Sequence, residues 1–250
     1  MRSSILLAIL PTLFVAGQVV AEGTVPTAEA LLSQSIAHHD PRGVFRSRTH
    51  SIETHTVYSP ELAEARGRKE SHGVITLDPG AGTFRYVVEA AGHVVEYVIA
   101  EGEGRTLLDG STDISDEDRD RLRIRTPELY RDYFEYVYGL PMKLRDPGTR
   151  IDPEVDVTEF MNREAWAIRV TYEPEVGKDI WYFYFDPETS ALVGSRFFHD
   201  ESKNDGEYIV YEGQVVDEES GLRLSASHAW YYNDGDGHLA TDTITSFRTE

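Results

Sequence analysis

The sequence predicts an α+β protein of mainly antiparallel β-structure. We expect a strongly curved sheet, an incomplete β-barrel, with an N-terminal helix and a central helical insertion on its concave side. Three observations predict this class. Short alternating segments recur about every ten residues between turns. One aromatic segment has the pattern of a strand that is apolar on both faces. One central segment has the pattern of a helix enclosed from more than one direction.

The aromatic segment begins at Lys178–Asp186, where apolar side chains alternate onto both faces of a predicted strand. Turns at Pro187 and at Asn204–Gly206 reverse the chain, so that 192–200 and 208–212 complete an antiparallel meander. An antiparallel sheet usually exposes one face to water. A helix, another sheet, a ligand or a partner must therefore cover the second apolar face.

Residues 1–21 have the pattern of a signal peptide. Arg2 precedes an apolar stretch over 5–20, and Val19–Ala21 fits the small-residue pattern for cleavage. The stretch is shorter than the roughly 20 residues that span a bilayer, and the chain has no cysteine for lipid attachment. We expect a periplasmic or secreted protein in which 22–250 form a single curved-sheet domain, without stable membrane insertion after cleavage.

Charge and missing motifs restrict the function. The formal net charge is -20, which excludes a nucleic-acid partner because such binding needs a basic surface. The paired glycines lack the third glycine of a dinucleotide loop, and no nucleophile elbow, zinc-protease motif or P-loop occurs. The sequence therefore predicts no cofactor, no catalytic residue and no metal ligand, and a protein that is not an enzyme.

Along the chain, Thr27 is placed to cap a first helix that runs to about His38 and ends at Asp40–Pro41. Alternating segments after it predict a first set of strands. The charged segment 60–69 between two of them is expected to be a loop. The predicted strands of this first set are 44–58, 70–78, 83–90, 93–101 and 105–109.

A second helix is expected in the middle of the chain. The charged segment 113–125 is interpreted as a solvated helical turn, and Thr126 then caps a helix whose first position is Pro127. Apolar side chains line two stripes of 129–140, and Pro141 ends the helix. No linker or repeat divides the chain, so strands before and after this helix should form one sheet. The later strands are expected at 155–160, 165–172, 213–216, 222–233 and 239–247.

One polar cluster merits attention, with imidazole and carboxylates on paired strands around a hairpin turn. Such groups bind a divalent cation or act as acid and base. Adjacent residues of a strand point to opposite faces, however, which favours a hydrogen-bond network of the turn over an ion site or catalysis. The cluster consists of His199, Asp200, Glu201, Asp205 and Glu207. Similarly, His38 and His39 are interpreted as cationic partners for helix C-terminal carbonyls rather than metal ligands.

Aromatic residues form the candidate binding site. Three on the central helix and three on the aromatic strand are expected to surround a hydrophobic ligand, with tyrosine hydroxyls at its polar end. The alternative is plain core packing. The candidate residues are Tyr130, Phe134, Tyr138, Trp181, Phe183 and Phe185.

Several ordered motifs resemble those of an uncharacterised exported bacterial family of unknown function. The motifs are 138–148, 181–187, 198–201 with 204–208, and 230–233. Members of that family are often lipoproteins, so the missing cysteine departs from its pattern, and the resemblance implies no activity. More distantly, the order of elements resembles the incomplete β-barrel of periplasmic lipoprotein carriers and outer-membrane lipoprotein receptors, which hold acyl chains between a sheet and a helical lid.

The leading functional hypothesis is a non-enzymatic envelope protein. It would bind a lipid, a lipoprotein acyl chain or another apolar ligand between the sheet and the helix 129–140, which acts as a lid. The alternative is a protein-interaction module that recruits an envelope protein through an exposed apolar patch and has no internal cavity. The second alternative is a hydrolase or metal site around His199, which requires its neighbours to converge in a cleft.

Overall fold

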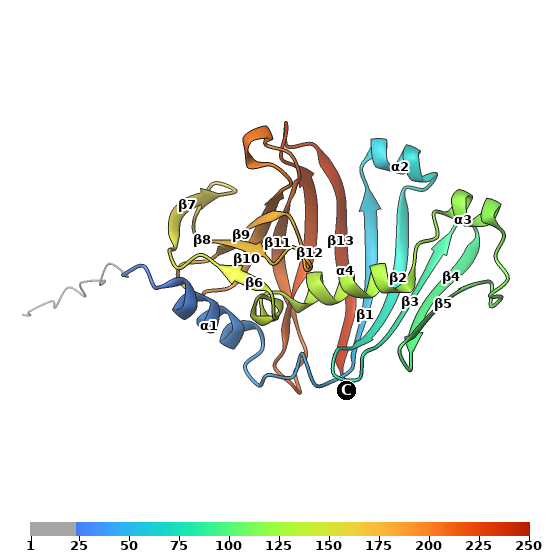
Figure 1. Cartoon of the computed structure of the whole chain (residues 1–250), viewed down its shortest axis with the longest axis horizontal. Coiled ribbons are helices and arrows are strands. Elements are labelled where there is room, and N and C mark those ends of the chain that lie inside the picture. Colours follow the sequence, from blue (N-terminus) through green and yellow to red (C-terminus); the bar gives the residue numbers. More distant parts are fainter. Residues whose placement is uncertain (1–23) are drawn as a thin grey trace, which may run out of the picture.

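The computed structural model describes residues 24–250, so the predicted signal peptide lies outside the described residues. Thirteen strands form one antiparallel sheet in the order β5-β4-β3-β2-β1-β13-β12-β11-β10-β9-β8-β6, with β7 paired to β8 (Figure 1). The strands are β1 (His50–Tyr58), β2 (Glu70–Asp78), β3 (Thr83–Ala90), β4 (His93–Ala100), β5 (Glu103–Leu108), β6 (Thr149–Ile151), β7 (Asp156–Phe160), β8 (Arg163–Tyr172), β9 (Ile180–Phe185), β10 (Leu192–Phe198), β11 (Glu207–Val216), β12 (Arg223–Tyr232) and β13 (His238–Thr249).

The helices lie mainly along one face of this sheet. Figure 1 shows α4 crossing the strands of that face, and α1 lies near the opposite end of the sheet from β5. We call this side the helix face. The helical segments are α1 (Ala28–His39), α2 (Pro60–Arg66), α3 (Asp116–Leu122), α4 (Pro127–Gly139) and the short 3-10 turns η1 (Met142–Arg145) and η2 (Glu201–Lys203).

The predicted α+β class and antiparallel pairing are confirmed, but the prediction of a strongly curved sheet, an incomplete β-barrel, is wrong. The edge strands β5 and β6 lie at opposite ends of the strand path, and the sheet is open and not strongly curled. The physical reason lies on the helix face, where α4 and α1 pack over different groups of strands. Together these two groups of strands extend from β5 to β8, so the helices cover a wide sheet.

The first and last strands join the two halves of the sheet. In β1, Ile52 is paired with Phe247 of β13, and the register shifts by one residue between Glu53 and Thr54. Strands from both sides of α4 therefore belong to one sheet, as the sequence predicted. The assignment of residues 22–250 to a single domain stays a prediction.

Three hydrophobic clusters stabilise the fold. The first packs α4 against β1 to β5, β12 and β13, and the second packs α1 and η1 against β8 to β11. The third lies on the opposite face, where Phe160 of β7 stacks on Tyr184 with ring centroids 4.1 Å apart. Strand alternation separates these clusters, because Phe183 and Phe185 point to the helix face while Tyr184 points away.

Two local predictions are wrong. The expected loop 60–69 contains α2, because the Ser59 hydroxyl caps its first turn and Gly67 ends it at φ 66°. The first strand begins at His50 rather than at residue 44, because the Asp40 carboxylate accepts hydrogen bonds from the backbone N–H of Val44 and Phe45 at 2.8 and 2.9 Å. A buried side chain thus fixes a turn where alternation predicted a strand.

Candidate functional site

A cavity of about 650 Å³ lies on the helix face beneath α4 and α2. Its floor comes from β1, β2 and β13, and β3 and β12 supply further walls. Alternation along β1 places Thr54, Thr56 and Tyr58 on this face, and Ser71 of β2 lies nearby with its hydroxyl 2.9 Å from that of Tyr58. The floor therefore combines three short hydroxyl side chains, which leave space above them, with the larger ring of Tyr58.

Gly73 makes room for an aromatic wall. It is paired with Thr54 across β1 and β2, and a Cβ atom there would lie 2.8 Å from Cε2 of Tyr86. The ring of Tyr86 thus occupies the place of a side chain on β2. Tyr86 then contacts α4, with its centroid 5.2 Å from that of Tyr130 and 4.7 Å from that of Phe134.

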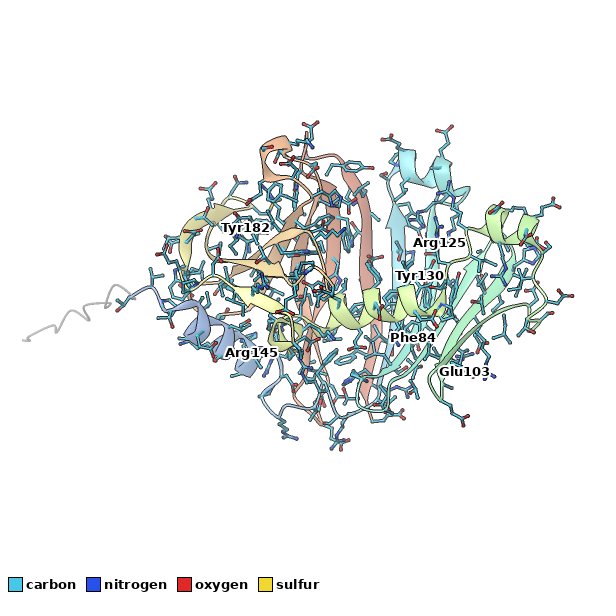
Figure 2. All side chains as sticks on the ribbon, in the orientation of Figure 1. Phe84, Glu103, Arg125, Tyr130, Arg145 and Tyr182 are labelled. Carbon is cyan, nitrogen blue, oxygen red and sulfur yellow. The ribbon has the colours of Figure 1, made fainter. Side chains whose placement is uncertain are left out.

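The helix α4 forms the roof of the cavity. The Thr126 hydroxyl accepts a hydrogen bond from the backbone N–H of Leu129 at 3.3 Å, which fixes where the helix begins. Tyr130, Phe134 and Tyr138 follow at intervals of four residues, line the cavity and face the sheet. Figure 2 shows Tyr130 and Arg125 near the N-terminal end of α4. The helix therefore presents one aromatic stripe to the cavity.

Four arginines, Arg66, Arg68, Arg123 and Arg125, also line the cavity, and we call them the arginine rim. The guanidinium groups of Arg66 and Arg68 lie 5.0 and 5.8 Å from the ring centroid of Tyr58. Within residues 24–250, none of the four lies within 4.0 Å of a carboxylate oxygen. Uncompensated positive charge therefore gathers at one place on a chain whose formal net charge is -20.

Backbone contacts hold part of the rim in place. Arg68 donates to the carbonyl oxygen of Glu89 at 2.7 Å, and Arg123 donates to that of Ala65 at 2.7 Å. The second contact joins the segment after α3 to α2, which brings the two arginine pairs together. Each guanidinium has five N–H donors, so one such bond leaves most of its donors free for a ligand.

The two carboxyl groups that line the cavity do not neutralise this rim fully. Burial raises the pKa of Asp242, whose oxygens accept hydrogen bonds from the Thr56 hydroxyl at 2.5 Å and the Trp230 Nε1–H at 3.1 Å. Burial also raises the pKa of Glu207. Their low-polarity surroundings disfavour the charged form of each carboxyl. The cavity is thus cationic at the rim and has short polar groups and aromatic rings inside.

The structure does not bring all six predicted ligand-binding residues together. Tyr130, Phe134 and Tyr138 line the cavity. Phe183 and Phe185 are fully buried in the second hydrophobic cluster, and Trp181 packs against Tyr136 on another side of α4, with centroids 5.6 Å apart. Because α4 is apolar on several sides, its stripes pack over different strands. Phe183 and Phe185 belong to the core, Trp181 is partly buried against it, and the helical three stay candidates for ligand binding.

The sequence does not predict the arginine rim, because its members lie in two charged segments, one interpreted as a loop (60–69) and the other as a solvated helical turn (113–125). One signal was present. Both segments contain the same Arg-x-Arg spacing, at 66–68 and at 123–125. That spacing alone does not show that the two segments meet.

The polar cluster around His199 divides among different partners. His199 Nδ1 lies 2.7 Å from Asp179, which raises the pKa of the imidazole. Asp200 and Asp205 accept hydrogen bonds from backbone N–H groups of this turn, and Glu201 accepts from the hydroxyl of Tyr182 at 2.6 Å. Glu207 points to the cavity instead. Only Asp200 and Asp205 take part in the hydrogen bonds of the turn itself, and within residues 24–250 the five side chains do not gather as a group of metal-ligand atoms.

The interpretation of His39 as a cation is wrong. Burial lowers its pKa to about 4, so the ring is neutral at ordinary pH. The ring bonds to backbone groups of β12 and β10 rather than to the carbonyls of its own helix.

Within residues 24–250, no helix has the length and apolar composition needed to cross a membrane.

The chain is similar in structure to a number of solved proteins, and three of them show the range of this similarity. A LolA superfamily protein from Nitrosomonas europaea has a TM-score of 0.49 at 10% identity, over 89% of this chain and 93% of that chain. A DUF1329 family protein from Desulfovibrio piger has a TM-score of 0.45 at 10% identity, over 89% and 92%. MucB, solved in complex with MucA(peri), has a TM-score of 0.27 at 13% identity, over 89% and 56%.

The sequence comparisons confirm the resemblance to a family of unknown function. Among curated proteins, no sequence matches this chain. Residues 110–246 match the sequence model of the family of unknown function DUF6503, and because this match spans more than half of the chain, the protein belongs to that family.

Proposed function

We propose that this protein binds an amphipathic ligand in the cavity beneath α4, with the apolar chain inside and an anionic head at the arginine rim. A lipid or a lipoprotein acyl chain with an acidic group fits this description. The observation that carries the proposal is the combination of an aromatic cavity with four arginines that have no carboxylate partner within the described chain. Plain core packing would leave no such space and no such charge.

The size and walls of the cavity support binding of the apolar part. Its volume of about 650 Å³ lies within the range of roughly 300–1,000 Å³ that is typical of small-molecule sites. Uptake would be driven by apolar area leaving water, at ~25 cal/mol per Å². Tyrosine and tryptophan walls supply both apolar rings and hydrogen-bond donors, so they accept a chain that carries a polar end.

The arginine rim supports recognition of an anionic head. A guanidinium group is planar and always charged, and its paired N–H donors match the oxygens of a carboxylate or phosphate. The rim lies where α2 meets the segment between α3 and α4, so an anion there would also join these two segments. A neutral amphiphile would gain the apolar burial but none of these charge-assisted hydrogen bonds.

The packing of α4 supports a role as a lid. After its C-terminal end, Met142 and Leu144 of η1 are buried, with 4% and 2% exposure. Near its N-terminal end, Leu129 is 55% exposed and Tyr133 is 38% exposed. We infer that the N-terminal half of α4 moves to admit the ligand, because Leu129 and Tyr133 on that half are exposed, and that the rings of Tyr130 and Phe134 then separate from Tyr86. We also infer an exported protein, periplasmic or secreted, and this inference rests on the pattern of residues 1–21.

Competition with a fluorescent fatty acid tests the proposal. Dodecanoate and dodecanol share one apolar chain and differ in head charge, so both are measured as competitors. We expect saturable binding with dodecanoate the tighter ligand, accompanied by a change in the fluorescence of Trp230, which lines the cavity. Absence of saturable binding by both compounds would refute the proposal. Equal affinities would refute its anionic part.

Two kinds of variant make the test specific. Ala240→Phe fills the cavity from β13 and should weaken both competitors by about tenfold or more. The pair Arg66→Glu and Arg123→Glu reverses charge at the rim and should weaken only dodecanoate. The matched control is the pair Arg48→Glu and Arg248→Glu, which makes the same change of charge on exposed residues that do not line the cavity. Equal loss in both pairs would show a nonspecific charge effect.

A further inference from the structure

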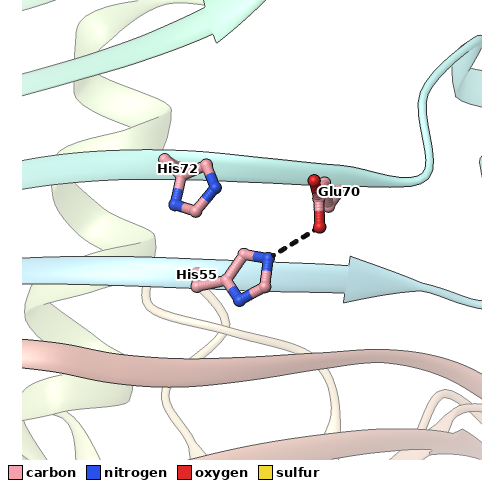
Figure 3. A group of neighbouring side chains, drawn as sticks. All are labelled: His55, Glu70 and His72. Carbon is pink, nitrogen blue, oxygen red and sulfur yellow. Dashed lines mark hydrogen bonds and ion pairs between the residues drawn. The ribbon is translucent and has the colours of Figure 1, made fainter.

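A second cluster lies on the face of the sheet opposite the cavity. It consists of His55 on β1 and of Glu70 and His72 on β2 (Figure 3). His55 and His72 are directly paired across the two strands. Neighbouring Thr54 and Ser71 line the cavity, so alternation points this trio away from it. The cluster is therefore independent of the proposed ligand site.

The donor atoms of the three side chains already lie close together. One ring nitrogen of each histidine and one carboxylate oxygen of Glu70 all lie within 4.8 Å of one another. His55 Nε2 is 3.0 Å from Oε2 of Glu70, and the two imidazole rings are stacked with centroids 4.5 Å apart. Donors around a tetrahedral zinc ion are about 3.3 Å apart, since each lies about 2.0 Å from the metal. Small side-chain rotations therefore suffice to bring the three atoms onto one ion.

The position of the residues favours a site that an ion can enter. The backbone hydrogen bonds of β1 and β2 fix the three Cα atoms, so only side-chain torsions have to adjust. The side chain of His55 is 30% exposed and that of Glu70 is 61% exposed. Within residues 24–250, Glu70 forms no ion pair with a lysine or arginine that would compete with a metal ion.

A simple ion pair does not account for the whole arrangement. His55 and Glu70 satisfy each other through one hydrogen bond. His72 has no hydrogen-bond partner among the described residues, although its ring is held parallel to that of His55 at 4°. A surface ion pair needs only two side chains. A metal site needs at least a third ligand, and His72 lies beside the pair of His55 and Glu70 in that position.

We propose that His55, Glu70 and His72 bind a divalent transition-metal ion, for which zinc is the reference ion. Imidazole nitrogen and carboxylate oxygen are ligands that zinc accepts, and three protein ligands leave one tetrahedral position for water. The ion replaces the hydrogen bond between His55 and Glu70 and bridges β1 to β2. Because the ion binds the folded strands in register, it stabilises the folded protein in proportion to its concentration.

Isothermal titration of the purified chelator-treated protein with zinc chloride tests this proposal. We expect one saturable site, and a weakening by about tenfold or more in His72→Ala and in Glu70→Gln. Cobalt absorption provides a second readout, since a tetrahedral site gives intense visible bands that Glu70→Gln should change. The matched control is His93→Ala, which removes a histidine at the start of β4 that pairs with Asp109, just after β5, without a third ligand.

The outcomes separate this site from the cavity. Zinc binding that persists equally in His72→Ala and Glu70→Gln would overturn the proposal, as would the absence of saturable zinc binding. Dodecanoate competition should be the same for His72→Ala and the unaltered protein, because the trio faces away from the cavity. Melting temperatures measured in chelator show whether each variant is folded, so a lost site is distinguished from a lost fold.

Discussion

The imidazole of His39, at the end of α1, accepts a hydrogen bond through Nε2 from the backbone N–H of Leu192 at the start of β10, at 3.0 Å. Its Nδ1–H donates to the carbonyl oxygen of Arg223 on β12, also at 3.0 Å. One neutral ring thus joins the N-terminal helix to two strands of the sheet. Protonation of Nε2 would remove the acceptor that the Leu192 N–H requires, and burial lowers the pKa of His39 to about 4.

We therefore expect stability to fall with pH below the usual histidine pKa. Between pH 6.5 and about 4, the unfolded chain binds a proton at His39 that the folded chain does not, so acid favours unfolding. This one residue should contribute a slope of about 1.4 kcal/mol per pH unit, or about 3 kcal/mol over the whole interval. His228, whose pKa burial also lowers to about 4, acts in the same direction.

Urea unfolding of His39→Gln across this pH range measures the effect. Glutamine does not titrate and keeps one donor and one acceptor, so the slope should decrease by about 1.4 kcal/mol per pH unit. The free-energy difference at pH 7.5, where the histidine is neutral in both states, gives the baseline for lost packing. A variant with an undiminished slope would contradict the assignment of His39 as a buried neutral ring.

Asp242 should show the opposite dependence on pH. Burial raises its pKa in the folded state, so its contribution to stability is present at low pH and is lost as pH rises through the folded pKa. Asparagine at this position does not titrate. The free energy of unfolding of Asp242→Asn, relative to the unaltered protein, should therefore increase between pH 4.5 and pH 8. A relative stability that decreases over that range would show that the carboxylate is favoured in the fold.

Gly194 on β10 leaves space for the ring of Phe160, which covers the third hydrophobic cluster. A Cβ atom at Gly194 would overlap that ring and lie 2.8 Å from the backbone carbonyl oxygen of Ile209. Gly194→Ala should destabilise the protein by about 1–3 kcal/mol, the usual cost of overpacking. Denaturant melts measure the loss, and Gly177→Ala is the control because its Cβ would meet its nearest neighbour at 3.5 Å. Equal effects of both changes would refute this explanation.

Changing the N-terminal cap of α4 tests whether this helix, the roof of the cavity, opens separately from the sheet. Thr126→Ala removes the acceptor for the Leu129 N–H and should lower stability by about 1 kcal/mol. Thr126→Ser keeps the hydroxyl and should restore most of that loss. Hydrogen exchange of the backbone amides of residues 128–131 locates the effect, since opening of α4 should accelerate exchange there before the strands respond. Uniform acceleration over the whole chain would mean that α4 does not open separately.

Much of the local structure could be predicted because its causes lie within a few residues. Thr27 caps α1 as expected, with its hydroxyl 3.3 Å from the Ala30 N–H. Thr126 and Pro127 likewise predicted the start of α4. Alternation and turn residues predicted most strands and their antiparallel order. Alternation misled where a side chain distant in sequence or a cap intervened, as at the start of β1 and in α2.

The candidate sites depend on contacts between segments that are far apart in sequence. The Arg-x-Arg pairs at 66–68 and 123–125 meet only because the segment after α3 folds back onto α2, where Arg123 contacts Ala65. His55 faces His72 only through the register of β1 and β2. Local patterns set the type of each element, because capping and alternation act over short distances. Register, the width of the sheet and the packing of α4 set which side chains meet, because they depend on all the strands together.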